Sequence, residues 1–440
     1  MKTVRQVPLR RLVDPERPIT YGIVQAGPDV DGGVPYIRPT DMTDERGVVD
    51  EKALLRTSSD VARAYRRSEV REGDLVFSIG PSYGKVMIVP SSLSGANLTQ
   101  GTARIAVDRS VVHPRYLLWV LRSAECVQQW DCAVGGATFR SLNLEPLGRT
   151  AIPLVGDLHE QRMVARFLDA KLANLDSLIA KQGRLIELLQ EKRQAVISQS
   201  VTKGLDPKAP TKESGVEWLG KVPTHWDIRR IASISTKITN GYVGPTRDIL
   251  VTAGVRYLQS LHIKGNHVRF DEPYFVTAEW SNEHRKSILE TGDVLVVQTG
   301  DIGQVAVVSE DFAGCNCHAL IIVSPKRSAI YGEWLSWVLN STYGFHSLLS
   351  IQTGALHPHL NCGNVRDVPV PIPPLREQRE IIEFIYAESK RFDELTVKAR
   401  RSIELMHEHR SALISAAVTG KIDVRSATGV PTESAAVVPA

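Results

Sequence analysis

The 440-residue chain contains an internal repeat, which limits the architectures open to it. Residues 160–206 align without gaps with residues 377–423, and both segments open with Glu-Gln-Arg. The segments upstream are related more faintly, for example through Trp-Val-Leu at 119–121 and again at 337–339. The chain is therefore an A–H–A′–H′ duplication, in which the H blocks stayed alike and the A blocks diverged.

Each H block has the features of one long helix. Neither block is interrupted by proline; each begins just after one, at Pro153 and Pro374, and Gly204 and Gly420 stand where helix C-caps are expected. Apolar residues recur at heptad-like steps, which predicts that the two helices pair as a coiled coil. The short connections on both sides of the second A block favour an antiparallel pair with a pseudo-two-fold axis over a parallel pair. The predicted helix-pairing residues are Leu168, Leu172, Leu175, Ile179, Ile186, Leu189, Val196, Ile385, Phe392, Ile403, Met406 and Leu413.

Polar residues interrupt this seam, notably Arg193 and Arg410, which occupy equivalent repeat positions. They are interpreted either as register-setting contacts or as exposed ends of the seam.

The A blocks combine short strands with amphipathic helices. Residues 74–79 and 294–298 are typical of strands, whereas 114–123 and 332–341 are typical of helices with a buried tryptophan. We therefore predict an α+β fold with two similar mixed α/β domains separated by the two long helices. The predicted boundaries are 1–155 for the first domain, 156–204 for the first helix, 205–224 for a linker, 225–373 for the second domain, 374–421 for the second helix and 422–440 for a flexible tail.

Composition narrows the class of protein. The net charge of +4 permits nucleic-acid binding without requiring it. Five cysteines without a Cys-x-x-Cys pair disfavour a disulfide framework and a cysteine zinc site. No apolar run approaches the roughly 20 residues that span a bilayer, and the N-terminus lacks an apolar signal core. These features predict a cytoplasmic protein that does not contact membranes.

No catalytic motif is present in the sequence. Residues 80–86 approach a Walker A loop but have one spacer residue too few, and Val86 stands where Ser or Thr is needed. Five residues of the second copy could imitate a metal site: Cys315, Cys317, His357, His359 and Cys362. The first copy has Phe139, Ser141 and Leu144 in place of His357, His359 and Cys362, so the repeat does not share such a site. We predict neither a catalytic site nor a metal site.

Two motifs in this chain resemble those of a known family. Residues 373–378 read Pro-Pro-Leu-Arg-Glu-Gln before the second long helix, and residues 214–220 read Ser-Gly-Val-Glu-Trp-Leu-Gly before Pro-Thr-His-Trp at 223–226. Together with the A–H–A′–H′ duplication, they resemble the specificity (S) subunit of type I restriction–modification systems over nearly the whole chain.

The resemblance implies a recognition subunit that is not itself an enzyme. Each A block would be a target-recognition domain that reads one half of a bipartite double-stranded DNA sequence, and the helices would set the spacer and dock the methyltransferase subunits. The implied partners are two modification (methyltransferase) subunits and two restriction (motor-nuclease) subunits. Those partners would use S-adenosylmethionine, ATP and Mg²⁺, whereas this chain would bind no cofactor. The alternative is a coiled-coil adaptor whose globular domains bind proteins rather than DNA.

Candidate DNA-binding residues come from loops between the predicted strands at matching positions of the two copies. Arg and Lys suit guanine, whereas Asn and Gln suit adenine. In the first domain the candidates are Arg38, Thr40, Asp41, Ser82, Tyr83, Lys85, Gln100, Arg104 and Arg140. In the second they are Gln259, Ser260, His262, Lys264, Gln298, Thr299, Asp301, Gln304, Asn316, His318 and His357.

Overall fold

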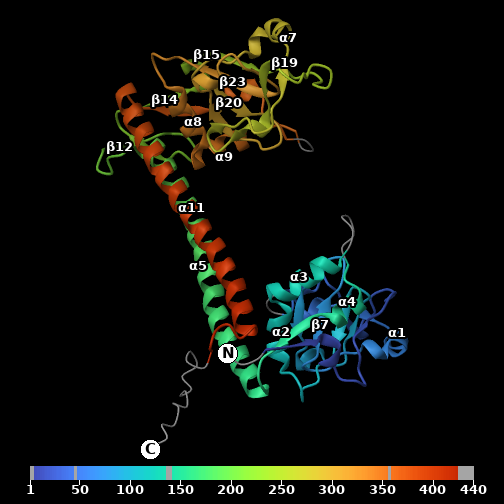
Figure 1. The fold of residues 1–440 in the computed structure, drawn as a ribbon. Coiled ribbons are helices and arrows are strands. Elements are labelled where there is room, and N and C mark those ends of the chain that lie inside the picture. The colour runs from blue at the N-terminus through green and yellow to red at the C-terminus, as the bar shows by residue number, and fades with distance from the viewer. Residues whose placement is uncertain (1–3, 44–46, 135–140, 355–357, 425–440) are drawn as a thin grey trace, which may run out of the picture. The chain divides into compact units, whose positions relative to one another are not determined.

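The computed structural model describes residues 4–43, 47–134, 141–354 and 358–424, and the chain divides into two compact units (Figure 1). The first unit comprises residues 1–183 and 401–440, and the second comprises residues 184–400. Each unit therefore includes part of both long helices, α5 (Leu158–Lys203) and α11 (Leu375–Val418). The predicted α+β class is confirmed, because each unit combines helices with small sheets.

The first unit is built on small sheets. Its strands are β1 (Arg5–Pro8), β2 (Thr20–Tyr21), β3 (Val34–Ile37), β4 (Met42–Thr43), β5 (Gly47–Val48), β6 (Arg56–Thr57), β7 (Leu75–Ser78), β8 (Val86–Ile88), β9 (Asn97–Leu98), β10 (Thr102–Ile105) and β11 (Ala151–Leu154). The largest sheet is antiparallel in the order β2-β10-β7-β8. A second sheet has the order β6-β3-β9, in which β3 and β9 run parallel; β1 pairs with β11, and β4 with β5.

The shorter helices in the described part of the first unit are α1 (Ser59–Ala64), α2 (Pro114–Leu121), α3 (Ala124–Ala133) and α4 (Leu144–Arg149). Helix α2 is apolar along most of its length, and Trp119 is buried as expected from the sequence. Its side chains share one core with the four-stranded sheet and with α5 and α11.

The second unit has sheets with the same strand orders. Its strands are β12 (Thr211–Glu213), β13 (Lys221–Pro223), β14 (Asp227–Arg230), β15 (Ser235–Asn240), β16 (Val255–Leu258), β17 (Ile263–Lys264), β18 (His267–Val268), β19 (Phe275–Val276), β20 (Val294–Val297), β21 (Val305–Val307), β22 (Asn316–Cys317), β23 (Leu320–Pro325) and β24 (Pro369–Ile372). The four-stranded sheet has the order β15-β23-β20-β21, and the three-stranded sheet has the order β19-β16-β22 with β16 and β22 parallel. Strand β14 pairs with β24, and β17 with β18.

The shorter helices of this unit are α6 (Ile231–Ile234), α7 (Ala278–Glu283), α8 (Gly332–Asn340), α9 (Thr342–Ser350) and α10 (Cys362–Val365). Trp334 and Trp337 of α8 are buried in its core. The segment 205–224, expected to be a linker, contains the β12–β13 hairpin; of the predicted tail, residues from 425 onward lie outside the described residues.

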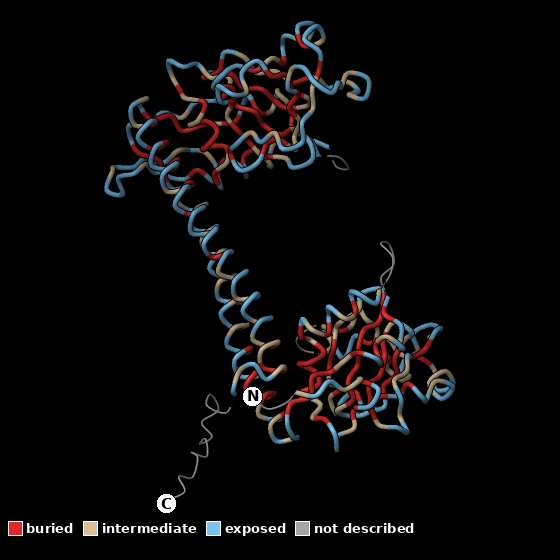
Figure 2. The backbone as a smooth tube through the Cα atoms, in the orientation of Figure 1, coloured by how far each residue is buried: buried red, intermediate tan, exposed pale blue. Residues whose placement is uncertain are grey.

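Helices α5 and α11 pack together within each unit. In the first unit, Leu168 of α5 and Ile414 of α11 belong to one buried cluster. In the second unit, Ile197 of α5 and Ile385 of α11 do the same. Figure 2 shows buried residues gathered in the globular part of each unit, with mostly exposed or intermediate residues along the helices. No helix in the described ranges is both long enough and apolar enough to cross a membrane.

Ion pairs also join the two helices. In the first unit, Arg410 Nε lies 3.3 Å from Asp176 Oδ1. In the second, Arg193 Nη1 lies 3.1 Å from Asp393 Oδ1. The arginines that interrupt the apolar seam therefore contact the opposite helix and are not exposed ends of the seam.

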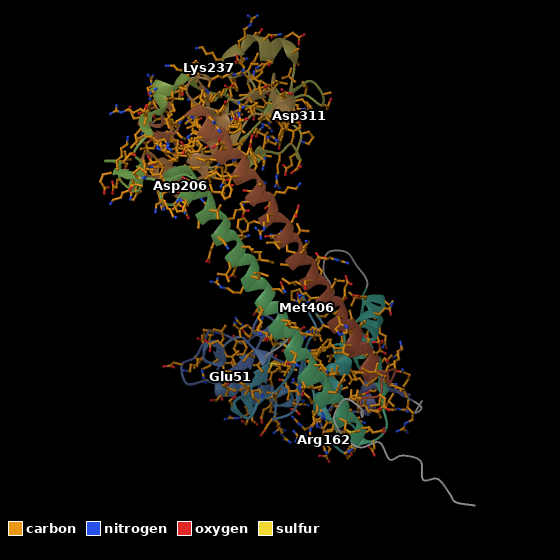
Figure 3. All side chains as sticks on the ribbon, turned by 90° about the vertical axis from the view of Figure 1, so that its left-hand side faces the viewer. Glu51, Arg162, Asp206, Lys237, Asp311 and Met406 are labelled. Carbon is orange, nitrogen blue, oxygen red and sulfur yellow. The ribbon has the colours of Figure 1, made fainter. Side chains whose placement is uncertain are left out.

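The predicted helix-pairing residues are buried to different degrees. Leu168, Leu172, Ile385 and Phe392 are buried. The other eight are half-buried: Leu175, Ile179, Ile186, Leu189, Val196, Ile403, Met406 and Leu413. Figure 3 shows the side chains of both helices, with Arg162 of α5 and Met406 of α11 labelled.

A buried glutamine joins α5 to the globular part of the first unit. The side chain of Gln161 accepts a hydrogen bond from the His113 N–H at 2.8 Å, and its amide nitrogen donates to the Val155 carbonyl at 3.4 Å. His113 precedes α2 and Val155 precedes α5, so one side chain links the starts of two helices.

The equivalent residue of the second repeat, Gln378, makes the same kind of link. Its Oε1 accepts from the Tyr331 N–H at 3.0 Å, in front of α8. Its Nε2 donates to the carbonyls of Pro373, at 2.9 Å, and Ala329, at 3.0 Å. Because a buried amide must be paired, these bonds explain why the repeated triplet contains glutamine.

Candidate nucleic-acid interface

A cavity of about 940 Å³ lies in the first unit where strands β3 and β9 end. These strands run parallel, with Tyr36 opposite Asn97, so the segments that follow them leave the sheet at the same edge. The lining includes Tyr21, Tyr36, Arg38, Thr40, Gln100 and Asn143. The structure thus brings the sequence candidates Arg38, Thr40 and Gln100 to one place.

Arg38 and Asp41 form a close pair in the turn after β3. Arg38 Nη2 lies 2.6 Å from Asp41 Oδ1, and Nε lies 3.0 Å from Oδ2. Asp41 also accepts from the Arg38 backbone N–H at 2.8 Å. The hydrogen bonds that Arg38 donates to the Asp41 carboxylate raise the pKa of Arg38. Asp41 is thus a positioning partner for the arginine, whose side chain remains 37% exposed.

Lys85 also holds this turn. Its Nζ donates to the carbonyl of Met42 at 2.9 Å and to that of Pro39 at 3.4 Å. The Thr102 hydroxyl donates to the carbonyl of Ile37 at 3.0 Å. Lys85 therefore stabilises the backbone of the turn through these two carbonyls.

Gly101 allows the segments around the cavity to approach one another. A Cβ at this position would lie 2.7 Å from the Gly80 carbonyl oxygen and 2.8 Å from Pro39 Cγ. Since contacts under 3.0 Å force a rearrangement, the close approach of these loops requires glycine.

The remaining described candidates of the first domain lie in the loop between β7 and β8. Ser82 is exposed, and the Tyr83 hydroxyl donates to Asp131 Oδ1 of α3 at 2.5 Å. Arg140 lies outside the described residues.

The prediction that Arg104 reads bases is wrong in this structure. Arg104 is 4% exposed, and its guanidinium donates to the carbonyls of Arg67, Glu69 and Pro18 at 2.5–3.3 Å. Burial lowers the pKa of Arg104. The side chain is used inside the unit to join three backbone segments.

Two aromatic residues at the cavity were not predicted. Tyr21 and Tyr36 line it, and the Arg67 guanidinium lies 5.8 Å from the centre of the Tyr21 ring. An apolar wall beside a cation is typical of surfaces that stack on bases and attract phosphates. The sequence contained no periodic signal for this arrangement, because the residues come from separate short segments.

In the second unit, the corresponding sheet edge is formed by β16 and β22, where Tyr257 lies opposite Asn316. Gln259 follows β16, and His318 follows β22. Ser260 is half-buried in the next turn, and Lys264 is exposed on β17. Gln259, Ser260 and His318 thus lie near the edge that corresponds to the first-unit cavity.

His262 is buried, which corrects its prediction as a DNA contact. Its Nδ1 accepts from the Gln259 backbone N–H at 2.8 Å, and its Nε2 lies 2.8 Å from the Glu272 carbonyl oxygen. Both ring nitrogens are therefore used to hold the turn after β16, with the histidine 1% exposed.

Asn316 is likewise a structural residue rather than a surface contact. It is fully buried; its Nδ2 donates to Ser281 Oγ at 3.1 Å, and its Oδ1 accepts from the Cys317 N–H at 2.8 Å. These bonds connect β22 with α7.

Aromatic rings gather beside this edge. Trp280 stacks on His284 with ring centres 4.0 Å apart, and both rings pack edge-on against Tyr242 at 5.0 Å. The Tyr257 hydroxyl lies 3.4 Å from His318 Nδ1, and burial lowers the pKa of His318. The second unit therefore presents an aromatic cluster at this edge.

The β20–β21 hairpin carries four further candidates, of which Thr299 and Asp301 are exposed. Gln298 is half-buried, and its Oε1 is enclosed without a hydrogen-bond partner. Gln304 lines a different cavity, of about 470 Å³, together with Arg193. The four residues therefore do not face one common site, and His357 lies outside the described residues.

Among the described residues, no three His, Cys, Asp or Glu side chains are placed to hold a metal ion. Cys315 and Cys317 are buried, and burial raises the pKa of both thiols. Cys362 Sγ lies 2.8 Å from Asn240 Oδ1.

Comparison with known proteins gives a consistent likeness. Residues 223–405 match the family model of the type I restriction modification DNA specificity domain. The type I restriction enzyme EcoBI specificity subunit of Escherichia coli is 26% identical over 67% of this chain and 64% of its own length. The putative type I restriction enzyme MjaX specificity subunit of Methanocaldococcus jannaschii is 24% identical over 80% of this chain and 79% of its own length.

Two solved structures share the fold. One, from work on complex assembly and conformational transition of the type I R-M system, aligns with a TM-score of 0.72 at 17% identity, over 95% of this chain and 98% of that one. The HsdS subunit of Thermoanaerobacter tengcongensis aligns with a TM-score of 0.55 at 17% identity, over 95% and 97% of the two chains. By these comparisons the chain is similar to the specificity subunits of type I restriction–modification systems, and residues 223–405 match the model of that family's DNA specificity domain.

Proposed function

We propose that this chain is the non-catalytic DNA-specificity subunit of a type I restriction–modification complex. Each globular domain reads one half of a bipartite double-stranded DNA sequence. The observation that carries this proposal is the match of residues 223–405 to a DNA specificity domain, whose sheets have the same strand orders as those of the first unit.

We further propose that the molecule is an internal duplication around an antiparallel coiled coil with a pseudo-two-fold axis. Arg193 and Arg410 are equivalent repeat positions, and so are Asp176 and Asp393. Exchanging the repeats therefore maps the ion pair of one unit onto that of the other. Such reciprocity is what a two-fold relation between paired helices predicts.

In this proposal the paired helices set the spacer between half-sites and dock the other subunits. Apolar side chains at equivalent positions of α5 and α11 are exposed: Leu178 with Leu395, and Leu188 with Leu405. Exposed apolar residues at repeat-related positions support two equivalent docking surfaces, one for each of two modification subunits. Two restriction subunits complete the complex; the partners use S-adenosylmethionine, ATP and Mg²⁺, and the complex acts in the cytoplasm.

The test is to map methylated adenines by long-read sequencing in host cells with and without the coding sequence of this chain. Adenine methylation requires the base to leave the stack and enter a methyltransferase pocket, so the modified positions report what this chain selects. We expect one split motif, with two short defined halves and an undefined gap, to lose its methylation when the chain is removed. Methylation that is unchanged by the deletion would contradict the proposal.

A further inference from the structure

We propose that Arg38 reads a guanine in the half-site bound by the first domain. This inference rests on the proposed function and names one base that the site selects. It is argued from the Arg38–Asp41 pair, the rigid turn that carries it and the cavity that it faces.

The pair with Asp41 leaves a defined edge of the guanidinium available. Arginine has five N–H donors in one plane. Asp41 occupies the side edge, taking Nε at 3.0 Å and one hydrogen of Nη2 at 2.6 Å. Among the described residues, the Arg38 guanidinium donates hydrogen bonds to Asp41 alone. The end edge formed by Nη1 and Nη2 therefore stays available for a base. Two parallel donors on that edge match O6 and N7 of guanine in the major groove.

The turn holds this edge in place before DNA binds. Asp41 accepts from the Arg38 backbone N–H at 2.8 Å, while the Asp41 N–H donates back to the Arg38 carbonyl at 3.0 Å. Lys85 fixes the carbonyl of Met42, and Thr102 fixes that of Ile37. An arginine that is already immobilised loses less conformational entropy on binding than a free one, and a fixed direction favours a base edge over a mobile phosphate contact.

The lining of the cavity around Arg38 favours a base edge with two acceptors, such as that of guanine. Among the described residues that line the cavity, Arg38 alone carries a charge, and the rest are aliphatic, aromatic or uncharged polar residues. At the same place after the parallel strand of the second unit stands Gln259: residues 36–38 read Tyr-Ile-Arg, and residues 257–259 read Tyr-Leu-Gln. Because glutamine suits adenine rather than guanine, this exchange gives the two domains different readers at matched positions.

The first test maps the methylated motif in cells that express the complete complex with the full-length Arg38→Ala chain. We expect one G·C position in one half of the motif to become degenerate, while the other half and the gap stay unchanged. The matched control is Arg63→Ala, which removes an arginine paired with an aspartate three residues away but exposed to solvent. This control should leave every motif position as it was.

The second test measures DNA binding by the purified complex on duplexes in which 7-deazaguanine replaces each guanine of the half-sites in turn. This base lacks the N7 acceptor, so wild-type affinity should fall about 5- to 100-fold at one position. The Arg38→Lys variant keeps the positive charge but loses the two parallel N–H donors of the guanidinium. Its affinity should therefore be the same for guanine and 7-deazaguanine at that position. The 7-deazaguanine series is measured on the wild-type complex as well, so the test gives a result even if a variant fails to fold.

The outcomes separate this inference from the proposed function. Sequence-specific methylation with no 7-deazaguanine-sensitive position in either half-site would overturn the role of Arg38 and leave the proposed function standing. An Arg38→Ala complex that loses affinity equally for all duplexes would do the same, because Arg38 would then be a phosphate contact. Absence of a split motif in the wild type would overturn the proposed function itself.

Discussion

Arg104 is a buried cation that joins backbone segments distant in sequence. Its guanidinium reaches carbonyl oxygens of Pro18, Arg67 and Glu69, and nearby Arg17 pairs with Asp74 at 2.5 Å. A buried charge is tolerated only where such partners surround it. Arg104 therefore contributes to the stability of the first unit.

Replacing Arg104 with methionine should lower the stability of the first unit by about 2–4 kcal/mol, because three carbonyls lose a charged donor. Hydrogen exchange measures this as lost amide protection in β7 and β10, which form the sheet around Arg104. The control is Arg66→Met, at an exposed arginine of the same unit, where we expect a change within about 0.5 kcal/mol. Equal amide protection of β7 and β10 in the two variants would refute the structural role of Arg104.

The sequence could not distinguish these arginines. Arg38 and Arg104 were both predicted as DNA contacts, because arginine suits guanine. The two arginines differ in their tertiary surroundings. Arg104 donates to the carbonyls of residues 18, 67 and 69, whereas Arg38 lines a cavity. No local pattern records which backbone carbonyls will converge on a side chain. His262 and Asn316 were misassigned for the same reason.

At the scale of elements, one buried amide side chain in each unit joins the start of a long helix to the globular part, in addition to the shared hydrophobic core. Gln161 and Gln378 each join the start of a long helix to the start of a shorter one. A side chain that both accepts and donates defines the angle at which the helix leaves its unit. If the paired helices set the distance between the two half-sites, these glutamines define where each recognition domain is attached to them.

Replacing Gln378 with leucine should weaken the junction between α11 and the second unit by about 2–3 kcal/mol, since the Tyr331 N–H and two carbonyls lose their partner. The measurement is amide exchange at the starts of α8 and α11. Gln199→Leu makes the same change on an exposed face of α5 and should leave that exchange unaltered. If both variants behave alike, the anchoring role is excluded.

Long-range periodicity made the helices predictable, whereas short pairings were not. Prolines and glycines at their ends, with apolar residues at heptad steps, were enough to predict α5 and α11 as helices. Two-residue strands such as β9 and β22 carry no alternation, yet their parallel pairing creates the edge where Arg38 and Gln259 lie. The hairpin at 211–223 was missed because the residues that lead into it, 204–212, contain two prolines and two lysines and are typical of a linker.

At the scale of the whole molecule, the proposed function requires two DNA-reading domains on one pair of helices. The two units have matching strand orders but different side chains at the edge of the three-stranded sheet. A conserved frame with divergent contacts is what a split DNA sequence with unlike halves requires. Each half of the motif should therefore depend on one domain alone.

Exchange of residues 225–373 for the matching domain of another specificity subunit should change one half of the methylated motif and leave the other half intact. The physical reason is that base contacts are local to a domain, whereas phosphate contacts carry no sequence information. Methylation mapping of cells with the hybrid chain is the measurement. A change in both halves would show that the domains do not read independently.

The most direct test of the account inserts one heptad into each long helix, after Gly183 in α5 and after Arg400 in α11, where the two units meet in the sequence. Seven residues add about 10.5 Å to a helix, and each base pair adds about 3.4 Å to the DNA axis. Methylated-adenine mapping should find both half-sites unchanged and the gap longer by about three base pairs. A motif with its original gap would contradict the claim that the helices set the spacing.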